Sequence, residues 1–288
     1  MTAPEPVLRV SDLHVSLGTV DVLRGVSFAV GRGQGVVLLG ANGSGKSTLM
    51  RAINGLVRAS SGQVTLDGIR LIGANRGQLR LARRRIGCVF QQFNLVPQLT
   101  AFQNVLFGAM GQRPLGVVSC LGPLARGEDR DRALHYLERV GLADRARHRP
   151  TELSGGQQQR VAIARMLMQQ PHFVLADEPI ASLDPKAGRE VLDLLWRIVD
   201  DAGLSMLCSL HQLDLAREYG DRILGLQAGR LVLDAAVADV ADERLDALYA
   251  GAPSSGVQPS GAAALRTSRS SVKCVKTWRT VPAARQSA

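Results

Sequence analysis

An apolar run that leads into a glycine-rich loop constrains the fold of this chain more than any other feature of its sequence. The run "GVVLLG" (35–40) is typical of a strand buried on both faces of a parallel sheet. The loop "GANGSGKST" (40–48) follows it, and Leu49, Ile53 and Leu56 then recur at helical spacing. Strand, glycine loop and helix in this order predict one unit of an α/β fold with a parallel sheet.

The loop has the residue pattern of a phosphate-binding loop, G-x-x-x-x-G-K-[ST]. Glycines allow successive backbone N–H groups to point at one anion, and the start of the following helix adds partial positive charge. We expect Lys46 to reach the β- and γ-phosphates of a nucleotide, and the Ser47 hydroxyl to bind Mg²⁺. The predicted phosphate-binding residues are Gly40, Ala41, Asn42, Gly43, Ser44, Gly45, Lys46, Ser47 and Thr48.

Strand patterns alternate with helix patterns along most of the chain. Those of strands are "VLRVSDLHVSL", "VSFAV", "FVLA", "LSMLCSL" and "RILGL". Between about residues 95 and 150 the pattern is helical and interrupted. One helix there is expected to end at Gly141 and to bury one face, made of Ala133, Leu134, Leu137 and Val140.

Two further helix starts are indicated by their capping residues. Ser154 is expected to cap a helix that is ended by Pro171. Asp184, followed by Pro185, is expected to start another. The expected buried residues are Val161, Ala164 and Met168 in the first helix, and Val191, Leu192, Leu195 and Val199 in the second.

The overall composition is that of a soluble globular protein. Of the 288 residues, 45% are hydrophobic and 21% charged, which suffices for one large domain or two smaller ones. No apolar run approaches the roughly 18 to 20 residues that cross a bilayer, and the N-terminus lacks the pattern of a secretory signal. The cysteines have neither metal-ligand spacing nor the density of a disulfide scaffold, which favours a reducing cytosol; they are Cys88, Cys120, Cys208 and Cys274.

The net charge of +10 is concentrated at the C-terminal end. Residues 253–288 hold six basic residues and no acidic one, so the remainder is only mildly basic. The same segment is rich in Ser, Ala, Gly and Pro, and we expect a disordered, solvated tail. Contact of the tail with anionic lipid or nucleic acid is the alternative.

Two motifs in the second half of the chain complete a site for phosphoryl chemistry. In "LSGGQQQR" (153–160) a serine and two glycines precede a helix, which makes a second anion-binding helix start. In "FVLADEP" (173–179) a buried strand ends in two carboxylates. We expect Asp177 to hold Mg²⁺ and Glu178 to orient or deprotonate the attacking water, because positioning and charge stabilisation dominate phosphoryl transfer.

In combination, the phosphate loop, "LSGGQ", "VLADEP", "SLD" (182–184) and "LHQ" (210–212) resemble the ATP-binding subunit of an ABC transporter over residues 7–240. The resemblance implies that Gln91 contacts Mg²⁺ and water, and that His211 is a switch residue near the γ-phosphate. It also implies that Asp184 links the two sites of a dimer. The residues expected to close over the nucleotide of the other copy are Ser154, Gly155, Gly156 and Gln157.

The same resemblance implies a P-loop NTPase (RecA-like) α/β core with an antiparallel β region and a helical signature subdomain. We expect the core in residues 1–94 and 155–252, the helical subdomain in 95–154 and the tail in 253–288. ATP and Mg²⁺ are the expected ligands of a homodimer on the cytoplasmic face of the inner membrane. Its expected partners are permease subunits and, indirectly, a periplasmic binding protein.

Within the family, the stretches "VFQQFNLVPQLTAFQNVLFGAMG" and "LHQLDLAREYGDRILGLQAGRLV" are most similar to the ATPase subunit of phosphonate importers. The alternatives are a polar amino-acid or methionine importer, and an ABC ATPase that acts on nucleic acid. The last is disfavoured because the chain has one such domain and no long coiled-coil insertion.

One position departs from the family pattern. The family places an aromatic residue before the second strand, where it stacks on adenine, and this chain has Leu17 there. Leucine packs against a base without the stacking geometry of an aromatic ring. We therefore expect a change in adenine affinity or preference that the apolar Val22 nearby does not restore.

Overall fold

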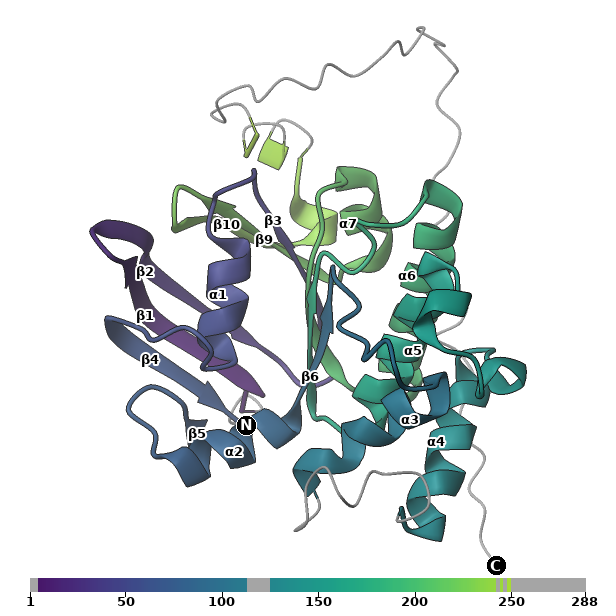
Figure 1. The fold of residues 1–288 in the computed structure, drawn as a ribbon. Helices are drawn as coiled ribbons and strands as arrows, with labels where there is room; N and C mark the ends of the chain where they lie inside the picture. Colours follow the sequence, from purple (N-terminus) through teal and green to yellow (C-terminus); the bar gives the residue numbers. More distant parts are fainter. Residues whose placement is uncertain (1–4, 113–124, 242–243, 246–247, 250–288) are drawn as a thin grey trace, which may run out of the picture.

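The protein is described by a computed structural model that covers residues 5–112, 125–241, 244–245 and 248–249. Two sheets form the framework (Figure 1). The first is antiparallel, with the strand order β2-β1-β4-β5. The second has the order β10-β9-β3-β8-β7-β6 and is parallel except for β10, which runs antiparallel to β9. This is the predicted mixture of a parallel α/β core and an antiparallel region.

The strands are β1 (Leu8–Leu17), β2 (Val20–Val30), β3 (Gly35–Leu39), β4 (Ser61–Leu66), β5 (Ile69–Arg70), β6 (Ile86–Phe90), β7 (Phe173–Asp177), β8 (Ser205–Ser209), β9 (Arg222–Gln227) and β10 (Arg230–Ala236). The α-helices are α1 (Lys46–Ile53), α2 (Arg76–Arg85), α3 (Ala101–Leu106), α4 (Gly127–Arg139), α5 (Gly155–Met168), α6 (Pro185–Asp201) and α7 (Leu213–Tyr219). Short 3-10 helices are η1 (Phe107–Gln112), η3 (Ala143–Arg145), η4 (Pro150–Glu152) and η5 (Val237–Asp239).

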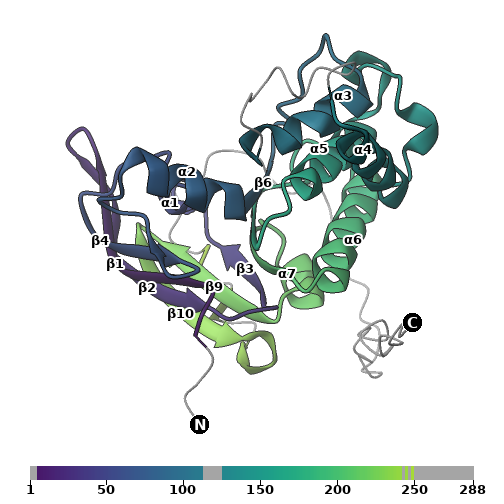
Figure 2. The same ribbon diagram turned by 90° about the horizontal axis from the view of Figure 1, so that it is seen from below.

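The second sheet separates two hydrophobic cores. Successive side chains of a strand point to opposite faces, so Val36 and Leu38 of β3 join the core with α1 and the first sheet. Val37 and Leu39 join the other core, with α3 to α7. Figure 2 shows the corresponding arrangement, with α1 and the first sheet on one side and α3 to α6 on the other. All five residues of β3 are buried, as predicted for the run 35–40.

The predicted helix starts are confirmed. The Ser154 hydroxyl accepts a hydrogen bond from the N–H of Gln157, whose side chain in turn accepts from the N–H of Ser154, which is a capping box. Asp184 caps α6 through the N–H of Ala187, with Pro185 as the first helical residue. The buried faces of α5 and α6 contain all the residues predicted for them.

Two details of the helix predictions are wrong. Helix α1 ends at Ile53, and Leu56, which follows a turn at Gly55 with positive φ, is 57% exposed. In α4, Ala133 and Leu137 are buried, as is Val140 at its end, but Leu134 is 47% exposed because it lies at the edge of the packed face. Helix α5 ends at Met168 with Gln169 as its cap, and Pro171 lies two residues beyond the cap, as predicted.

No helix among the described residues is both long and apolar enough to span a bilayer. Cys120, Cys274 and the basic tail 253–288 lie outside the described residues. Cys88 and Cys208, which the structure does describe, are free thiols, and burial raises the pKa of Cys88 to about 12.

Candidate nucleotide-binding site

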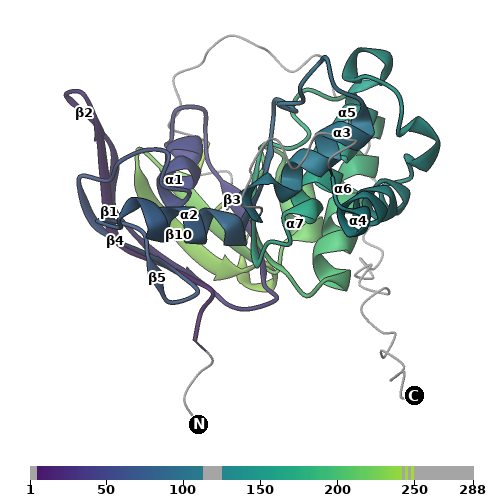
Figure 3. The same ribbon diagram turned by 60° about the horizontal axis from the view of Figure 1, so that its bottom comes forward.

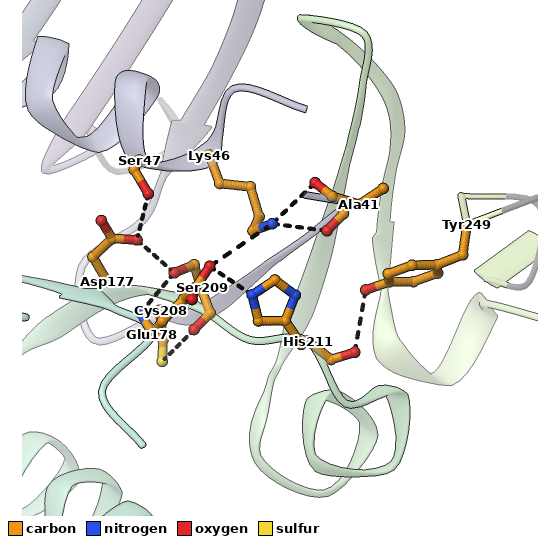
Figure 4. A network of polar contacts seen from close by, with 10 residues as sticks. Ala41, Lys46, Ser47, Asp177, Glu178, Cys208, Ser209, His211 and Tyr249 are labelled. Carbon is orange, nitrogen blue, oxygen red and sulfur yellow. Dashed lines mark hydrogen bonds and ion pairs between the residues drawn. The ribbon is translucent and has the colours of Figure 1, made fainter. Parts of the chain in front are cut away.

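Three parallel neighbours of the second sheet bring the predicted polar residues to one edge. Strand β8 lies between β3 and β7, and the carboxyl ends of all three point the same way. The phosphate loop follows β3. Asp177 ends β7 and Glu178 follows it, while Ser209 ends β8 and His211 lies in the loop after it. Figure 4 shows these side chains converging. Ligands of open α/β sheets bind at such carboxyl ends, so the topology itself assembles the site.

The phosphate loop depends on glycine at Gly40, which has a φ of +154°. A Cβ at this position would lie 2.3 Å from the backbone oxygen of Leu226 and 2.7 Å from the Ser44 hydroxyl. Backbone oxygen cannot move aside as a side chain can, so only glycine lets the loop leave β3 this close to β9.

Lys46 is buried, and its charge is held by backbone carbonyls. Its Nζ donates hydrogen bonds to the carbonyl oxygens of Gly40 at 2.8 Å and Ala41 at 3.2 Å. The Oε1 atom of Glu178 is 4.0 Å away. Burial lowers the pKa of Lys46, and the carboxylates of Glu178 and Asp177 oppose that shift. The ammonium is thereby folded over the loop that a phosphate would occupy.

Ser47 and Asp177 form a pair of oxygen donors of the kind that Mg²⁺ prefers. The Ser47 hydroxyl donates to Oδ1 of Asp177 at 3.3 Å, and the Ser209 hydroxyl donates to the same oxygen at 2.9 Å. A hydroxyl and a carboxylate at this separation fit a hard divalent ion that keeps most of its water. These residues therefore fit Mg²⁺, with Ser209 orienting the carboxylate from behind.

Glu178 occupies a strained backbone position beside its partner His211. Its φ of +49° lies in the left-handed region that residues other than glycine rarely adopt. Its N–H donates to the Ser209 hydroxyl at 2.8 Å, and Nε2 of His211 lies 2.6 Å from its Oε1. Such strain is typical of functional positions. It directs the carboxylate toward Lys46 and the phosphate loop.

An open cavity of about 390 Å³ lies over the phosphate loop. Leu17 is not one of its lining residues and is half exposed at the end of β1. The lining consists of Val22, Asn42, Gly43, Gly45, Lys46, Ser47, Thr48 and Glu178. This set places apolar, phosphate-binding and carboxylate groups around one cavity, as a nucleotide requires.

The predicted signature residues lie elsewhere in the same chain. Residues 154–157 begin α5, and a Cβ on Gly155 would lie 3.0 Å from Leu183 while one on Gly156 would lie 3.3 Å from Ala187. The signature therefore packs against the start of α6, next to the cap Asp184. Figure 3 shows α1 and α5 on opposite sides of the second sheet. None of the residues 154–157 lines the cavity over the phosphate loop.

Gln91 follows β6, and its backbone carbonyl accepts a hydrogen bond from the Ser182 hydroxyl at 3.3 Å. It does not line the cavity over the phosphate loop. The bond nonetheless connects the loop of Gln91 to the segment between Glu178 and Asp184.

Sequence reasoning missed two residues that contact the site. Ser209 bridges Asp177 and the backbone of Glu178, and Tyr249 donates a hydrogen bond to the His211 carbonyl at 3.4 Å. A polar residue at the end of the buried strand 205–209, just before His211, was a usable signal for Ser209. Nothing in the local pattern indicated Tyr249, because its contact is with residues far away in sequence.

The fold and the site define a nucleoside-triphosphate-binding protein of the phosphate-loop class. A family model described as ABC transporter matches residues 23–181, more than half of the chain. The chain belongs to the ABC transporter family.

Similar proteins with curated names include several ATP-binding subunits of importers. The chain is 47% identical to the phosphonates import ATP-binding protein PhnC of Nocardia farcinica, over 90% of this chain and 96% of that protein. It is 48% identical to the phosphate-import ATP-binding protein PhnC of Mycolicibacterium smegmatis, over 83% and 90%. It is 44% identical to the hypophosphite import ATP-binding protein HtxD of Stutzerimonas stutzeri, over 84% and 70%.

Solved structures of cassettes have the same fold. A dimeric bacterial ABC transporter cassette matches with a TM-score of 0.69 and 34% identity, over 80% of this chain and 98% of that one. A dimeric ATP-binding cassette in a post-hydrolysis state, bound to ADP and phosphate, matches with a TM-score of 0.68 and the same identity and coverage.

Proposed function

We propose that the chain is the ATP-hydrolysing subunit of an importer for phosphonate or a related phosphorus oxyanion. The convergence of Lys46, Ser47, Asp177, Glu178 and His211 at one sheet edge supports the hydrolysis. The substrate class is supported by the names of similar proteins, which refer to phosphonates, phosphate and hypophosphite. All three are phosphorus oxyanions, and no residue of this chain is assigned to contact the transported solute.

In the proposed reaction each residue has a separate task. Lys46 and the N–H groups of the phosphate loop bind the β- and γ-phosphates. Glu178 accepts a proton from the attacking water, and His211, 2.6 Å from it, orients that carboxylate. Ser47, Asp177 and Gln91 would hold Mg²⁺, which would neutralise the developing phosphate charge.

A second copy of the chain completes the site in this proposal. Ser154, Gly155 and Gly156 begin a helix whose N–H groups are suited to an anion, yet they lie apart from the phosphate loop of their own chain. A twofold dimer in which each signature meets the phosphate loop of the other copy accounts for both observations. Asp184, beside the signature, is proposed to link the two sites. ATP then favours the closed dimer because only the closed form makes both sets of contacts.

Membrane subunits are proposed to dock in a groove of about 650 Å³ between α2, η1 and α5. Its lining combines apolar residues such as Phe107 and Met166 with five arginines and no acidic residue. The buried Nε of Arg84 has no hydrogen-bond partner among the described residues. This chemistry fits an acidic, amphipathic helix of a permease. Phe90, which precedes Gln91, also lines the groove, and we propose that Gln91 relays movement of the docked helix to the site.

We also propose the domain division expected from the sequence, in which residues 95–154, with η1, form a helical subdomain beside the core that contains α2. Rotation of this subdomain on dimer closure would move η1 relative to α2 and so move the docked helix. We propose that the protein is peripheral and lies on the cytoplasmic face of the inner membrane. A periplasmic binding protein would deliver the solute to the permease.

Growth of the source organism tests the function. A deletion strain is supplied with methylphosphonate, phosphate or hypophosphite as its only phosphorus source, with wild type or Glu178→Gln restored. We expect the deletion strain to lose growth on methylphosphonate and to keep growth on the other two sources. Restored wild type should rescue growth on methylphosphonate, and Glu178→Gln should not. Loss on phosphate instead would favour the function of the relative from Mycolicibacterium smegmatis. Growth on all three without this chain would contradict the proposal.

A further inference from the structure

Tyr249 contacts the loop that holds His211, and it lies far from that loop in the sequence. Its hydroxyl donates a hydrogen bond to the backbone carbonyl of His211 at 3.4 Å, as seen in Figure 4. The backbone of Gly40, which starts the phosphate loop, lies near enough to the same hydroxyl to lower its pKa. The hydroxyl is thus a bridge from the C-terminal segment to the loop after β8, beside the start of the phosphate loop.

The direction of the bond to His211 follows from its chemistry, because a phenol hydroxyl donates to a carbonyl oxygen. Burial raises the pKa of Tyr249, and the nearby backbone of Gly40 opposes that rise. The side chain thereby satisfies an acceptor on the loop after β8.

Gly40 and His211 each make a second contact, which is with one of the reacting groups. The Gly40 carbonyl accepts from Lys46 at 2.8 Å, and the His211 ring lies 2.6 Å from Glu178. Glu178 is 4.0 Å from Lys46, so a chain of polar contacts runs from Tyr249 to the phosphate loop. Tyr249 is the member of this chain that comes from the C-terminal segment, after η5.

The tyrosine is anchored by its neighbours rather than by its hydroxyl. Leu245 and Leu248 are buried in the core with α3 to α7. Leu248 packs so closely on β9 that a Cβ at Gly225 would lie 2.7 Å from it. Removal of the hydroxyl alone therefore leaves the segment in place and changes only the bridge.

We propose that Tyr249 is a positioning residue for ATP hydrolysis, which keeps the His211 loop in register with the phosphate loop so that Glu178 faces the γ-phosphate. The inference rests on the proposed hydrolysis. Without the bridge, the two loops are expected to shift independently, and the carboxylate spends less time in its productive orientation. Binding of nucleotide by the phosphate loop does not require the bridge.

Steady-state ATP hydrolysis by purified wild type, Tyr249→Phe and Tyr136→Phe provides the test. Tyr136 of α4 is half-buried in the helical region, so its variant removes the same atom elsewhere. We expect Tyr249→Phe to lower kcat about three- to tenfold with KM for ATP within about twofold, since positioning affects the transition state more than the ground state. Tyr136→Phe is expected to leave both unchanged.

A double-mutant cycle with His211→Ala, measured by single turnover, separates positioning from a general structural effect. If Tyr249 acts through His211, adding Tyr249→Phe to His211→Ala lowers the single-turnover rate by less than about a further twofold. An equal loss in both backgrounds, an unchanged kcat, or a rise in KM that matches the fall in kcat would overturn the inference. Absence of hydrolysis by wild type would instead contradict the proposed function.

Discussion

Nε2 of His211 and Oε1 of Glu178 lie 2.6 Å apart, although His211 follows β8 and Glu178 follows β7. The two strands are adjacent and parallel, so their ends deliver both side chains to the same point. Ser209 supports the pair, because its hydroxyl accepts from the Glu178 N–H. Three features thus determine the orientation of the Glu178 carboxylate: the order of the strands, the buried Ser209 hydroxyl and the His211 ring.

The first prediction concerns Glu178. Glu178→Gln keeps the shape of the side chain and its hydrogen bonding but removes the base. We expect ATP binding to remain and kcat to fall by at least about a hundredfold. The control is Glu190→Gln on α6, where an exposed glutamate pairs with Arg160, and its kcat is expected to equal that of wild type. Wild-type turnover by Glu178→Gln would refute the assigned role.

The second prediction concerns Ser209. Ser209→Ala removes the bond that orients Asp177, and we expect the Mg²⁺ concentration for half-maximal activity to rise about ten- to a hundredfold. Ser205 lies at the other end of β8, and its buried hydroxyl accepts from the Gly33 N–H. Ser205→Ala should lower thermal stability to a similar extent with no change in the Mg²⁺ titration. Equal titration curves for both variants would count against the orienting role.

The third prediction concerns Leu17, which is half exposed at the end of β1. Leu17→Tyr supplies the ring that the family pattern has there, and stacking contributes about 0.5 to 1.5 kcal/mol. We expect the Kd for ATP to fall about two- to tenfold, as measured by titration of a fluorescent nucleotide. Leu134→Tyr, at a similarly exposed leucine of α4, controls for a general effect of the ring. An unchanged Kd would show that the base lies elsewhere.

The fourth prediction concerns Asp67, whose buried carboxylate joins the β4–β5 turn to the core. Its Oδ2 is 2.6 Å from Nδ1 of His172, and its Oδ1 is 2.8 Å from Arg32. Burial would raise the pKa of Asp67, but these bonds hold the pKa below the ordinary value of 3.8. The ionised group therefore stabilises the fold above about pH 4, and this contribution is lost as the pH falls through the lowered pKa.

Asp67→Asn tests this, because asparagine tolerates the same left-handed backbone (φ +46°). We expect a loss of about 1 to 3 kcal/mol at neutral pH, shrinking as the pH falls below about 4, in denaturant titrations. Asp12 has the same φ and also contacts a histidine, but it is exposed. Asp12→Asn should cost less than about 1 kcal/mol at every pH. A loss for Asp67→Asn that is the same at all pH values would contradict the charge-based explanation.

Much of this structure was accessible from local sequence patterns. The strand before the phosphate loop and the caps Ser154 and Asp184 depend on residues adjacent in sequence, and the structure confirms all of them. The exposure of Leu56 and Leu134 was mispredicted because helical spacing does not reveal where a helix ends or how wide its packed face is.

The site was less accessible than the fold. Lys46 and Asp177 belong to motifs whose chemistry can be read from the residues themselves. Ser209 and Tyr249 have no motif of their own, and their roles arise from strand order and from the return of the C-terminal segment to Gly40. The same holds for the arginine-lined groove, because α2 and η1 become neighbours only on folding.

The central claim is that the nucleotide is held between the phosphate loop of one copy and Ser154 of another. Sedimentation of Glu178→Gln with Mg²⁺ and ATP, alone and combined with Ser154→Asp, tests it most directly. Aspartate still caps α5 but places a negative charge at the signature. Thr100→Asp, at the capping box of α3, is the matched control.

We expect dimers for Glu178→Gln and for its combination with Thr100→Asp. The combination with Ser154→Asp should remain monomeric and still bind ATP, with a Kd above that of Glu178→Gln alone, because only the dimer makes both sets of contacts. Dimers that persist with Ser154→Asp, or Glu178→Gln that stays monomeric with saturating ATP, would contradict the composite site.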